Sequence, residues 1–254
     1  MHQKFGRVLT FATCLITVCF SLSTLFFNLD LYTTYTYIVM VYLVIALVIW
    51  MEKENLQHFA LDRLSLVILV ASTIFRRRLG VENEWYALFM IAAAGGVMFL
   101  VGIRYWSKVP KTSLKWLIIG VAAAFVTLIP IIVIEASQWQ QETNAAAEPF
   151  GVFWNLIRRA IFELSFTAPI EEVLFRSFLW GYLINLKWSD KKVFWTQGIL
   201  FWCSHIGRIQ SPITFLISIP IMTYALSALR KHSGQTAPSV VAHLVINTVV
   251  STIL

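Results

Sequence analysis

Two adjacent carboxylates and a guanidinium, groups that can exchange protons or bind ions, interrupt an otherwise apolar stretch of the chain. Glu171, Glu172 and Arg176 lie within residues 161–184. An ionisable side chain costs at least about 2–3 kcal/mol at the centre of a bilayer, so such residues are functional candidates. Glu172 and Arg176 are four residues apart and share a helix face, whereas Glu171 points about 100° away and remains available to another partner. A structural ion cluster that only fixes helix packing accounts for these three residues equally well.

Two further apolar segments carry polar side chains suited to the same chemistry. One contains His205, and the other contains His243 and Asn247, four residues apart on one helix face. Counted from the nearest basic connectors, Glu171 and these three residues lie 12 to 16 positions into their segments, or about 18–24 Å along a helix. A single His on an apolar helix is more often a packed core residue, but agreement in depth predicts that the four groups meet in one site.

The hydrolysis of a peptide bond can be performed by a carboxylate, imidazoles and an amide that lie at the same depth within apolar helices. A buried glutamate can take a proton from water, while His and Asn can donate hydrogen bonds to the oxyanion that forms on the carbonyl group. Two Glu and two His are also ligand types of zinc, so a metal site stays open on the residues alone.

Patterns of other protease classes are missing from the sequence. It contains no His-Glu-x-x-His and no Gly-x-Ser-x-Gly, and none of its three Asp residues is paired within a span. Cys203 and Ser204 adjoin His205, but we expect both to face other sides of the same helix. Neither therefore qualifies as a nucleophile for that imidazole.

The composition is typical of a chain solvated by lipid. Of the 254 residues, 58% are apolar and 13% are charged, and the mean hydropathy is +0.73. The net charge of +7 comes from short clusters of Lys and Arg between apolar stretches. Such clusters indicate membrane topology rather than a nucleic-acid surface, so we expect the lipid bilayer as a partner and no nucleic acid.

Stretches near 20 apolar residues predict an all-α fold, a polytopic transmembrane bundle of about eight spans. A shorter apolar stretch at 65–75 is a ninth candidate. We expect N-terminal transmembrane helices of unassigned role in 1–115 and a transmembrane catalytic core in 116–254. The eight predicted spans are 8–29, 33–50, 85–103, 116–136, 161–184, 193–207, 212–230 and 239–254.

The distribution of Lys and Arg predicts the orientation of the back half. Connectors 104–115 and 185–192 are basic, whereas 137–157 contains no Lys or Arg. Positive residues are retained on the cytoplasmic side, so we expect the two basic connectors in the cytoplasm and 137–157 outside, as a loop of a multi-pass protein of the cell membrane.

At these residues the sequence resembles the CAAX-processing and bacteriocin-processing (CPBP, or Abi) family of intramembrane peptidases. Its three motifs are Glu-Glu-x-x-x-Arg, Phe-x-x-x-His and His-x-x-x-Asn. They correspond here to Glu171-Glu172 with Arg176, Phe201 with His205, and His243 with Asn247, in the family's order. Each motif alone is weak, but the three together on separate apolar segments are specific, and the resemblance covers about residues 160–250.

The resemblance implies a role for each matching residue. Glu171 is implied as the general base for the attacking water, with His205 helping to position that water. His243 and Asn247 are implied as the oxyanion donors. Family members are often described as metallopeptidases; because an amide is a better hydrogen-bond donor than a metal ligand, we favour a site without a cofactor, with zinc as the alternative.

As for the remaining motif residues, the resemblance implies that Glu172 and Arg176 orient the site, with Phe201 in support. It also implies a hydrolase that cleaves a small peptide or a membrane-associated protein. Bacterial relatives are linked to bacteriocin maturation, self-immunity and peptide signalling, and this compact chain is similar to that group.

Two functional hypotheses that involve no proteolysis stay open. The first is a catalytically idle membrane scaffold, or a bacteriocin-immunity protein that acts by binding. The second is a transporter that relays protons through buried Glu and His. The presence of all these polar residues in apolar segments argues against a scaffold, which has no use for them. The lack of two related halves in the sequence argues against a transporter.

Overall fold

The structure is a computed structural model that describes residues 31–54, 56–74, 84–139, 149–165 and 167–253. Across these residues it is helical and contains no strand, which confirms the predicted all-α class. The longer helices are α2 (Leu31–Met51), α4 (Arg63–Ile74), α5 (Glu84–Arg104), α6 (Leu114–Trp139), α7 (Pro149–Ser165), α10 (Asp190–Ser204), α11 (Ile219–Ser233) and α12 (Ala237–Ile253). The shorter ones are α3 (Leu56–Phe59), α8 (Thr167–Glu172) and α9 (Trp180–Asn185).

One helix of the described residues is by itself long and apolar enough to cross a membrane, over Leu114–Glu135 in α6. Shorter apolar helices occur at Val39–Met51, Arg63–Ser72, Phe89–Arg104 and Ala237–Thr252. The span predicted at 8–29 lies outside the described residues. The number of membrane crossings therefore stays a prediction.

The structure describes the predicted span 161–184 as several helical elements, and residue 166 between the first two lies outside the described residues. Helix α7 ends at Ser165, and a second helical run begins at Thr167 with α8. Pro169 lies in the first turn of α8, where its missing N–H costs no hydrogen bond, so it marks a helix start that hydropathy alone does not reveal. The run continues through a π-helical segment, Val173–Leu179, into α9.

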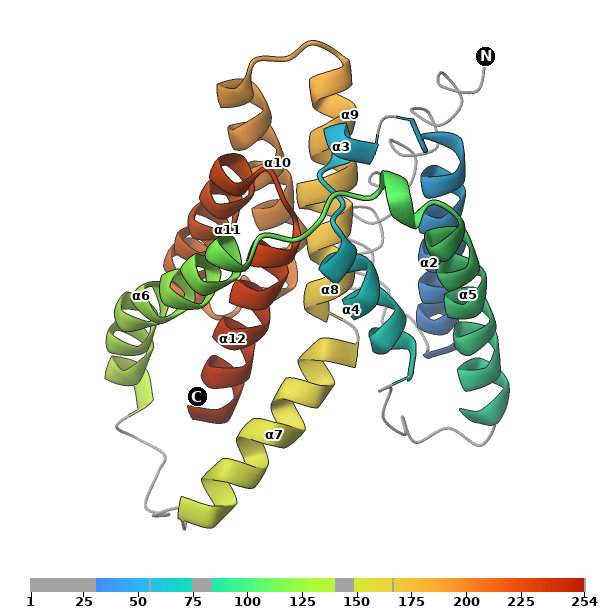
Figure 1. Ribbon diagram of the computed structural model, residues 1–254. Coiled ribbons are helices and arrows are strands. Elements are labelled where there is room, and N and C mark those ends of the chain that lie inside the picture. The colour runs from blue at the N-terminus through green and yellow to red at the C-terminus, as the bar shows by residue number, and fades with distance from the viewer. Residues whose placement is uncertain (1–30, 55, 75–83, 140–148, 166, 254) are drawn as a thin grey trace.

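Helix α7 also corrects the expectation that 137–157 is entirely a loop, because the helix begins at Pro149. Its N-terminal end extends below the other helices in Figure 1, while the helix also packs against α12 and α4. Its apolar side chains Phe153 and Trp154 are more than half exposed. Hydropathy did not reveal this helix because polar and apolar residues alternate along it with the helical period.

Two other span boundaries differ from the sequence prediction. Helix α10 ends at Ser204, so His205 lies just beyond the helix rather than within it. The predicted span 212–230 consists of a π-helical segment, Thr214–Ser218, followed by α11. Helix α11 ends at Ser233 and is capped by Gly234, whose φ of 65° places it in the left-handed region; the Gly234 amide donates to the Arg230 carbonyl at 3.1 Å.

The run from α8 to α9 passes through the middle of the molecule, with α6 and α10 to α12 on one side and α2 and α5 on the other (Figure 1). Every residue of its π-helical segment is buried. Close approach at two glycines supports this packing. A Cβ on Gly120 of α6 would lie 2.7 Å from the Pro238 carbonyl oxygen of α12, and one on Gly181 of α9 would clash with the ring of Phe59 in α3.

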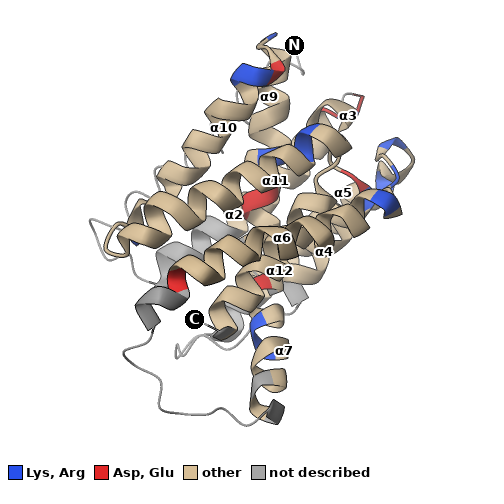
Figure 2. Ribbon diagram, turned by 90° about the vertical axis from the view of Figure 1, so that its left-hand side faces the viewer, with Lys and Arg blue, Asp and Glu red and all other residues tan. Residues whose placement is uncertain are grey.

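Basic residues gather at the end of the molecule where α3, α9 and the α5–α6 connector lie, and they occur again on α7 (Figure 2). Hydrogen bonds join two connectors at that end. The Ser113 amide donates to Oε1 of Gln235 at 2.9 Å, and Nε2 of Gln235 donates to the Lys111 carbonyl at 2.9 Å. This arrangement agrees with a shared membrane face for these connectors, while the side of the membrane stays a prediction.

A fully buried carboxylate, Asp62, ties the N-terminal part of the chain to α12. Its Oδ1 accepts from the Leu64 and Ser65 amides at 3.1 and 3.2 Å, at the start of α4. Its Oδ2 accepts from the Thr236 and Ala237 amides at 3.0 and 2.8 Å, at the start of α12. One side chain therefore satisfies the first amides of two helices that lie far apart in the sequence.

We expect Asp62→Ala to lower the free energy of unfolding by about 2 kcal/mol or more, because each lost helix cap costs ~0.5–2 kcal/mol. The measurement is thermal unfolding of the purified protein in detergent. Asp190→Ala is the matched control, since Asp190 lies in the first turn of α10 but is exposed. An equal effect of the two substitutions would contradict a double cap at Asp62.

Candidate active site

Glu172 joins two elements of the site through a single oxygen atom. Its Oε1 lies 3.0 Å from Nη1 of Arg176 and 2.9 Å from Nδ1 of His243. All three side chains are at most 1% exposed. A carboxylate only accepts hydrogen bonds, so the proton between His243 and Glu172 is assigned to Nδ1, which leaves Nε2 directed elsewhere. The predicted pairing of Glu172 with Arg176 is present, with His243 as a second partner.

Phe201 lies beneath this ion cluster. Its ring is fully buried, and the guanidinium carbon of Arg176 lies 3.7 Å from the ring centroid, a cation–π contact. The centroids of the His205 and His243 rings lie 4.6 and 6.0 Å from the Phe201 centroid. One aromatic ring therefore contacts the cation and both imidazoles and restricts how they can turn.

His205 is held by the last turn of α10. Its Nδ1 lies 2.9 Å from the Phe201 carbonyl, which can only accept, so Nδ1 donates and Nε2 faces the site. The expectation that Ser204 faces away from His205 is wrong, because Oγ of Ser204 lies 3.3 Å from Nδ1. The chain leaves the α-helix at this point, which changes the direction of the ring. The Ser204 hydroxyl donates to the same carbonyl at 2.7 Å.

Glu171 faces both imidazoles. Its Oε2 lies 3.8 Å from Nε2 of His205 and 3.9 Å from Nε2 of His243. This oxygen is buried and has no hydrogen-bond partner among the described residues. Separations of this size are too long for direct hydrogen bonds and fit a bridging water molecule. The adjacent glutamates therefore have different surroundings, as their positions on different helix faces predict.

Asn247 lies one helical turn beyond His243 and contacts a residue that the sequence reasoning did not single out. Its Nδ2 donates to Oε2 of Glu163 at 2.9 Å, and Glu163, from α7, is 7% exposed. Glu163 falls within the predicted span 161–184, so the criterion that selected Glu171, an ionisable group in an apolar stretch, could have identified it as well.

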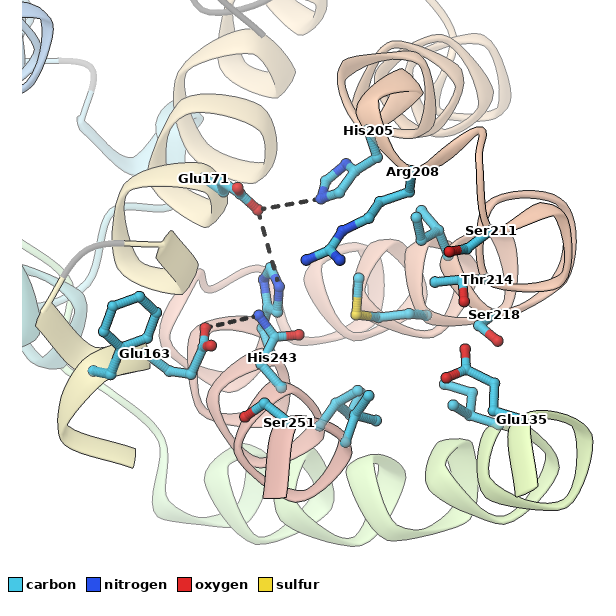
Figure 3. A pocket seen from close by; sticks show the side chains of 17 residues that line it. Glu135, Glu163, Glu171, His205, Arg208, Ser211, Thr214, Ser218, His243 and Ser251 are labelled. Carbon is cyan, nitrogen blue, oxygen red and sulfur yellow. Dashed lines mark hydrogen bonds and ion pairs between the residues drawn. The ribbon is translucent and has the colours of Figure 1, made fainter. Parts of the chain in front are cut away.

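Four of the predicted residues, Glu171, His205, His243 and Asn247, line one cavity of about 590 Å³ (Figure 3). Glu172, Arg176 and Phe201 lie behind this lining, in the protein interior. The cavity has further polar residues that the sequence reasoning did not select as site residues. They are Glu135, Glu163, Arg208, Ser211, Thr214, Ser218 and Ser251.

The described residues contain no group of three or more His, Cys, Asp or Glu side chains arranged to hold a metal ion. Glu171, His205 and His243 have the donor types that zinc uses, but the structure gives no fit for a shared ion. The reaction sequence proposed below therefore has no step through a metal.

Removing the cation of the buried pair should destabilise the protein. We expect Arg176→Ala to lower the free energy of unfolding by about 3–5 kcal/mol and to reduce abundance in the membrane, because Glu172 loses its compensating charge. Abundance is measured by immunoblotting and stability by thermal unfolding. Arg208→Ala is the control, since Arg208 is exposed and lines the cavity. Wild-type abundance of the Arg176 variant would show that the pair is dispensable.

Comparison with known proteins agrees with the resemblance seen in the motifs. Residues 153–249 match a family described as type II CAAX prenyl endopeptidase Rce1-like. No curated protein and no solved structure matches the chain. The matched segment contains all three motifs and most of the cavity lining. Residues 153–249 of this chain therefore match the Rce1-like family of CAAX-type proteases, within the CPBP family, over the segment that carries the site.

Proposed function

We propose that this chain is a multi-pass intramembrane endopeptidase of the cell membrane in which Glu171 activates water to hydrolyse a peptide bond. One observation carries the proposal. Oε2 of Glu171 is buried without a hydrogen-bond partner among the described residues, and Nε2 atoms of two imidazoles face it at 3.8 and 3.9 Å. A water molecule between these groups can donate one hydrogen to the carboxylate of Glu171 and the other to Nε2 of His205.

In the first step the water oxygen attacks the carbonyl carbon of the substrate as Glu171 takes a proton from the water. His205 positions the water through Nε2, since its Nδ1 is already bonded to the Phe201 carbonyl. The carbon–oxygen bond forms and the carbonyl oxygen becomes negative. When the carbon–nitrogen bond then breaks, Glu171 returns the proton to the leaving amine, so one carboxylate serves as base and then as acid.

His243 and Asn247 are the proposed donors to the oxyanion. Asn247 has two amide hydrogens, and one of them is held by Glu163, which leaves the other for the cavity. His243 donates through Nε2 when both ring nitrogens carry a proton, and Glu172 beside Nδ1 stabilises that charged ring. Glu163 and Glu172 are thus positioning residues for the two donors.

The proposed substrate is a small peptide or a membrane-associated protein. A cavity of about 590 Å³ is large enough to hold a short extended segment. Maturation of a bacteriocin or a signalling peptide, and self-immunity, are the processes that we propose for such an activity. The binding roles named above, scaffold or immunity protein, become the explanation if catalysis is absent.

We expect Glu171→Gln, His205→Ala and His243→Ala each to lower peptide cleavage by at least ~10²-fold, because each removes a proton-transfer or oxyanion group. The measurement compares, by mass spectrometry, the peptides released by cells that carry each variant at matched abundance. Glu54→Gln is the control, since Glu54 is exposed and pairs with Lys108 instead. Unchanged cleavage by the Glu171 variant would remove the enzymatic proposal in favour of a binding role.

The role of Asn247 separates oxyanion stabilisation from metal binding. We expect Asn247→Ala to reduce turnover by about 10²-fold, the usual loss for one oxyanion donor, and Asn247→Asp to be at least as damaging because it places negative charge near the oxyanion. The measurement is turnover of the purified protein, with elemental analysis before and after exhaustive chelation. Activity that is lost on chelation and restored by stoichiometric zinc would overturn the metal-free mechanism.

A further inference from the structure

The cavity is lined by three glutamates, Glu171, Glu163 and Glu135, and the proposed reaction assigns no role to Glu135. Glu135 lies near the end of α6 and is 8% exposed. Its Oε1 is buried and has no hydrogen-bond partner among the described residues. Ser218, also in the cavity lining, is 5% exposed, and its hydroxyl likewise has no hydrogen-bond partner within the described part of the chain.

Glu135 and Ser218 both line the cavity, and Figure 3 shows both on the side away from Glu171. The hydroxyl-bearing residues Ser211 and Thr214 continue along the same wall. Two buried oxygen atoms in one cavity that have no partners among the described residues cost free energy unless a ligand supplies donors to them. The wall is therefore suited to a group that carries several N–H donors and a positive charge.

The described residues do not supply that cation. Arg208 is the one Lys or Arg in the cavity lining, and no ion pair within 4.0 Å joins it to Glu135. Arg208 is exposed, whereas Glu135 is buried. A carboxylate that is desolvated without a charged partner is poised for a cation from outside the protein.

We propose that Glu135 and Ser218 form a specificity subsite that binds the ammonium or guanidinium group of a Lys or Arg side chain in the peptide substrate. This inference rests on the proposed function, since it names the substrate class of the same cavity. Glu135 and Glu171 lie on opposite sides of the view in Figure 3, so the cationic residue is separated along the peptide from the bond that is cleaved. An apolar segment that contains one basic residue is the substrate that fits.

The test begins with binding, which needs no catalysis. The probes are apolar octapeptides that carry a single Lys, and the same peptides with norleucine in its place. Binding to Glu171→Gln protein in detergent is compared with binding to the Glu171→Gln, Glu135→Gln double variant. We expect the Lys peptides to bind the first protein about 10-fold or more tightly than the norleucine peptides, and the double variant to lose this ratio.

Three further arms separate the alternatives. Acetylation of the peptide N-terminus should leave the ratio of Lys-peptide to norleucine-peptide affinity unchanged, because the bound cation is the side chain. If acetylation abolishes the preference, the subsite binds an α-amino group and the proposal is wrong. Glu135→Lys should reverse the preference toward peptides that carry Glu. Glu54→Gln, added to Glu171→Gln as a matched control, should keep the Lys preference, since Glu54 is exposed and pairs with Lys108.

If Lys peptides bind more tightly than norleucine peptides by the same factor with and without Glu135, the subsite proposal is wrong, even if peptides are cleaved. Wild-type protein that binds Lys peptides through Glu135 but cleaves none would instead retain the subsite and remove the proposed function. Cleavage ratios of wild-type and Glu135→Gln protein on the same peptide pairs complete the comparison. A loss that is equal for both peptides would show that Glu135 acts on stability alone.

Discussion

The shared oxygen of Glu172 is the interaction on which the rest of the site depends. Oε1 holds Arg176 from its own helical run and His243 from α12, and all three groups are almost completely removed from solvent. Charges in such surroundings persist only when they are paired. The pairing therefore fixes the position of α12 relative to the central helical run. It also determines which nitrogen of His243 faces Glu171.

The surrounding packing keeps that pairing in register. Phe201 contacts Arg176 and both imidazoles, and it connects α10 to the ion cluster. Asp62 caps α12 from the N-terminal part of the chain, outside the segment that matches the family. The π-helical segment over Val173–Leu179 follows directly after the two glutamates, in keeping with the frequent occurrence of π-helical turns at functional sites.

Two adjacent glutamates acquire different chemistry because their environments differ. Oε1 of Glu172 lies within hydrogen-bond distance of a guanidinium and an imidazole, and this pairing with two fixed partners suits orientation rather than proton transfer, although Oε2 has no hydrogen-bond partner among the described residues. Oε2 of Glu171 is buried, has no hydrogen-bond partner within the described ranges and faces two imidazole nitrogens at 3.8 and 3.9 Å, just beyond hydrogen-bond distance. Glu163 and Glu135 extend this pattern, since Glu163 is bonded to Asn247 and Oε1 of Glu135 has no hydrogen-bond partner in the described part of the chain. The four glutamates therefore differ in the groups that contact their carboxylates, although their residue type is the same.

The sequence by itself determined the helical class, the apolar segments, and the ionisable residues within them, because hydropathy and helical spacing are local properties. It also predicted that Glu172 pairs with Arg176 and that Glu171 faces elsewhere, since both follow from positions on one helix. Only the tertiary structure decided the break between α7 and α8 and the position of His205 beyond α10. It likewise decided that Glu172 serves two helices and that Glu163 meets Asn247, because these contacts join residues more than 70 positions apart, and local periodicity carries no information about such distances.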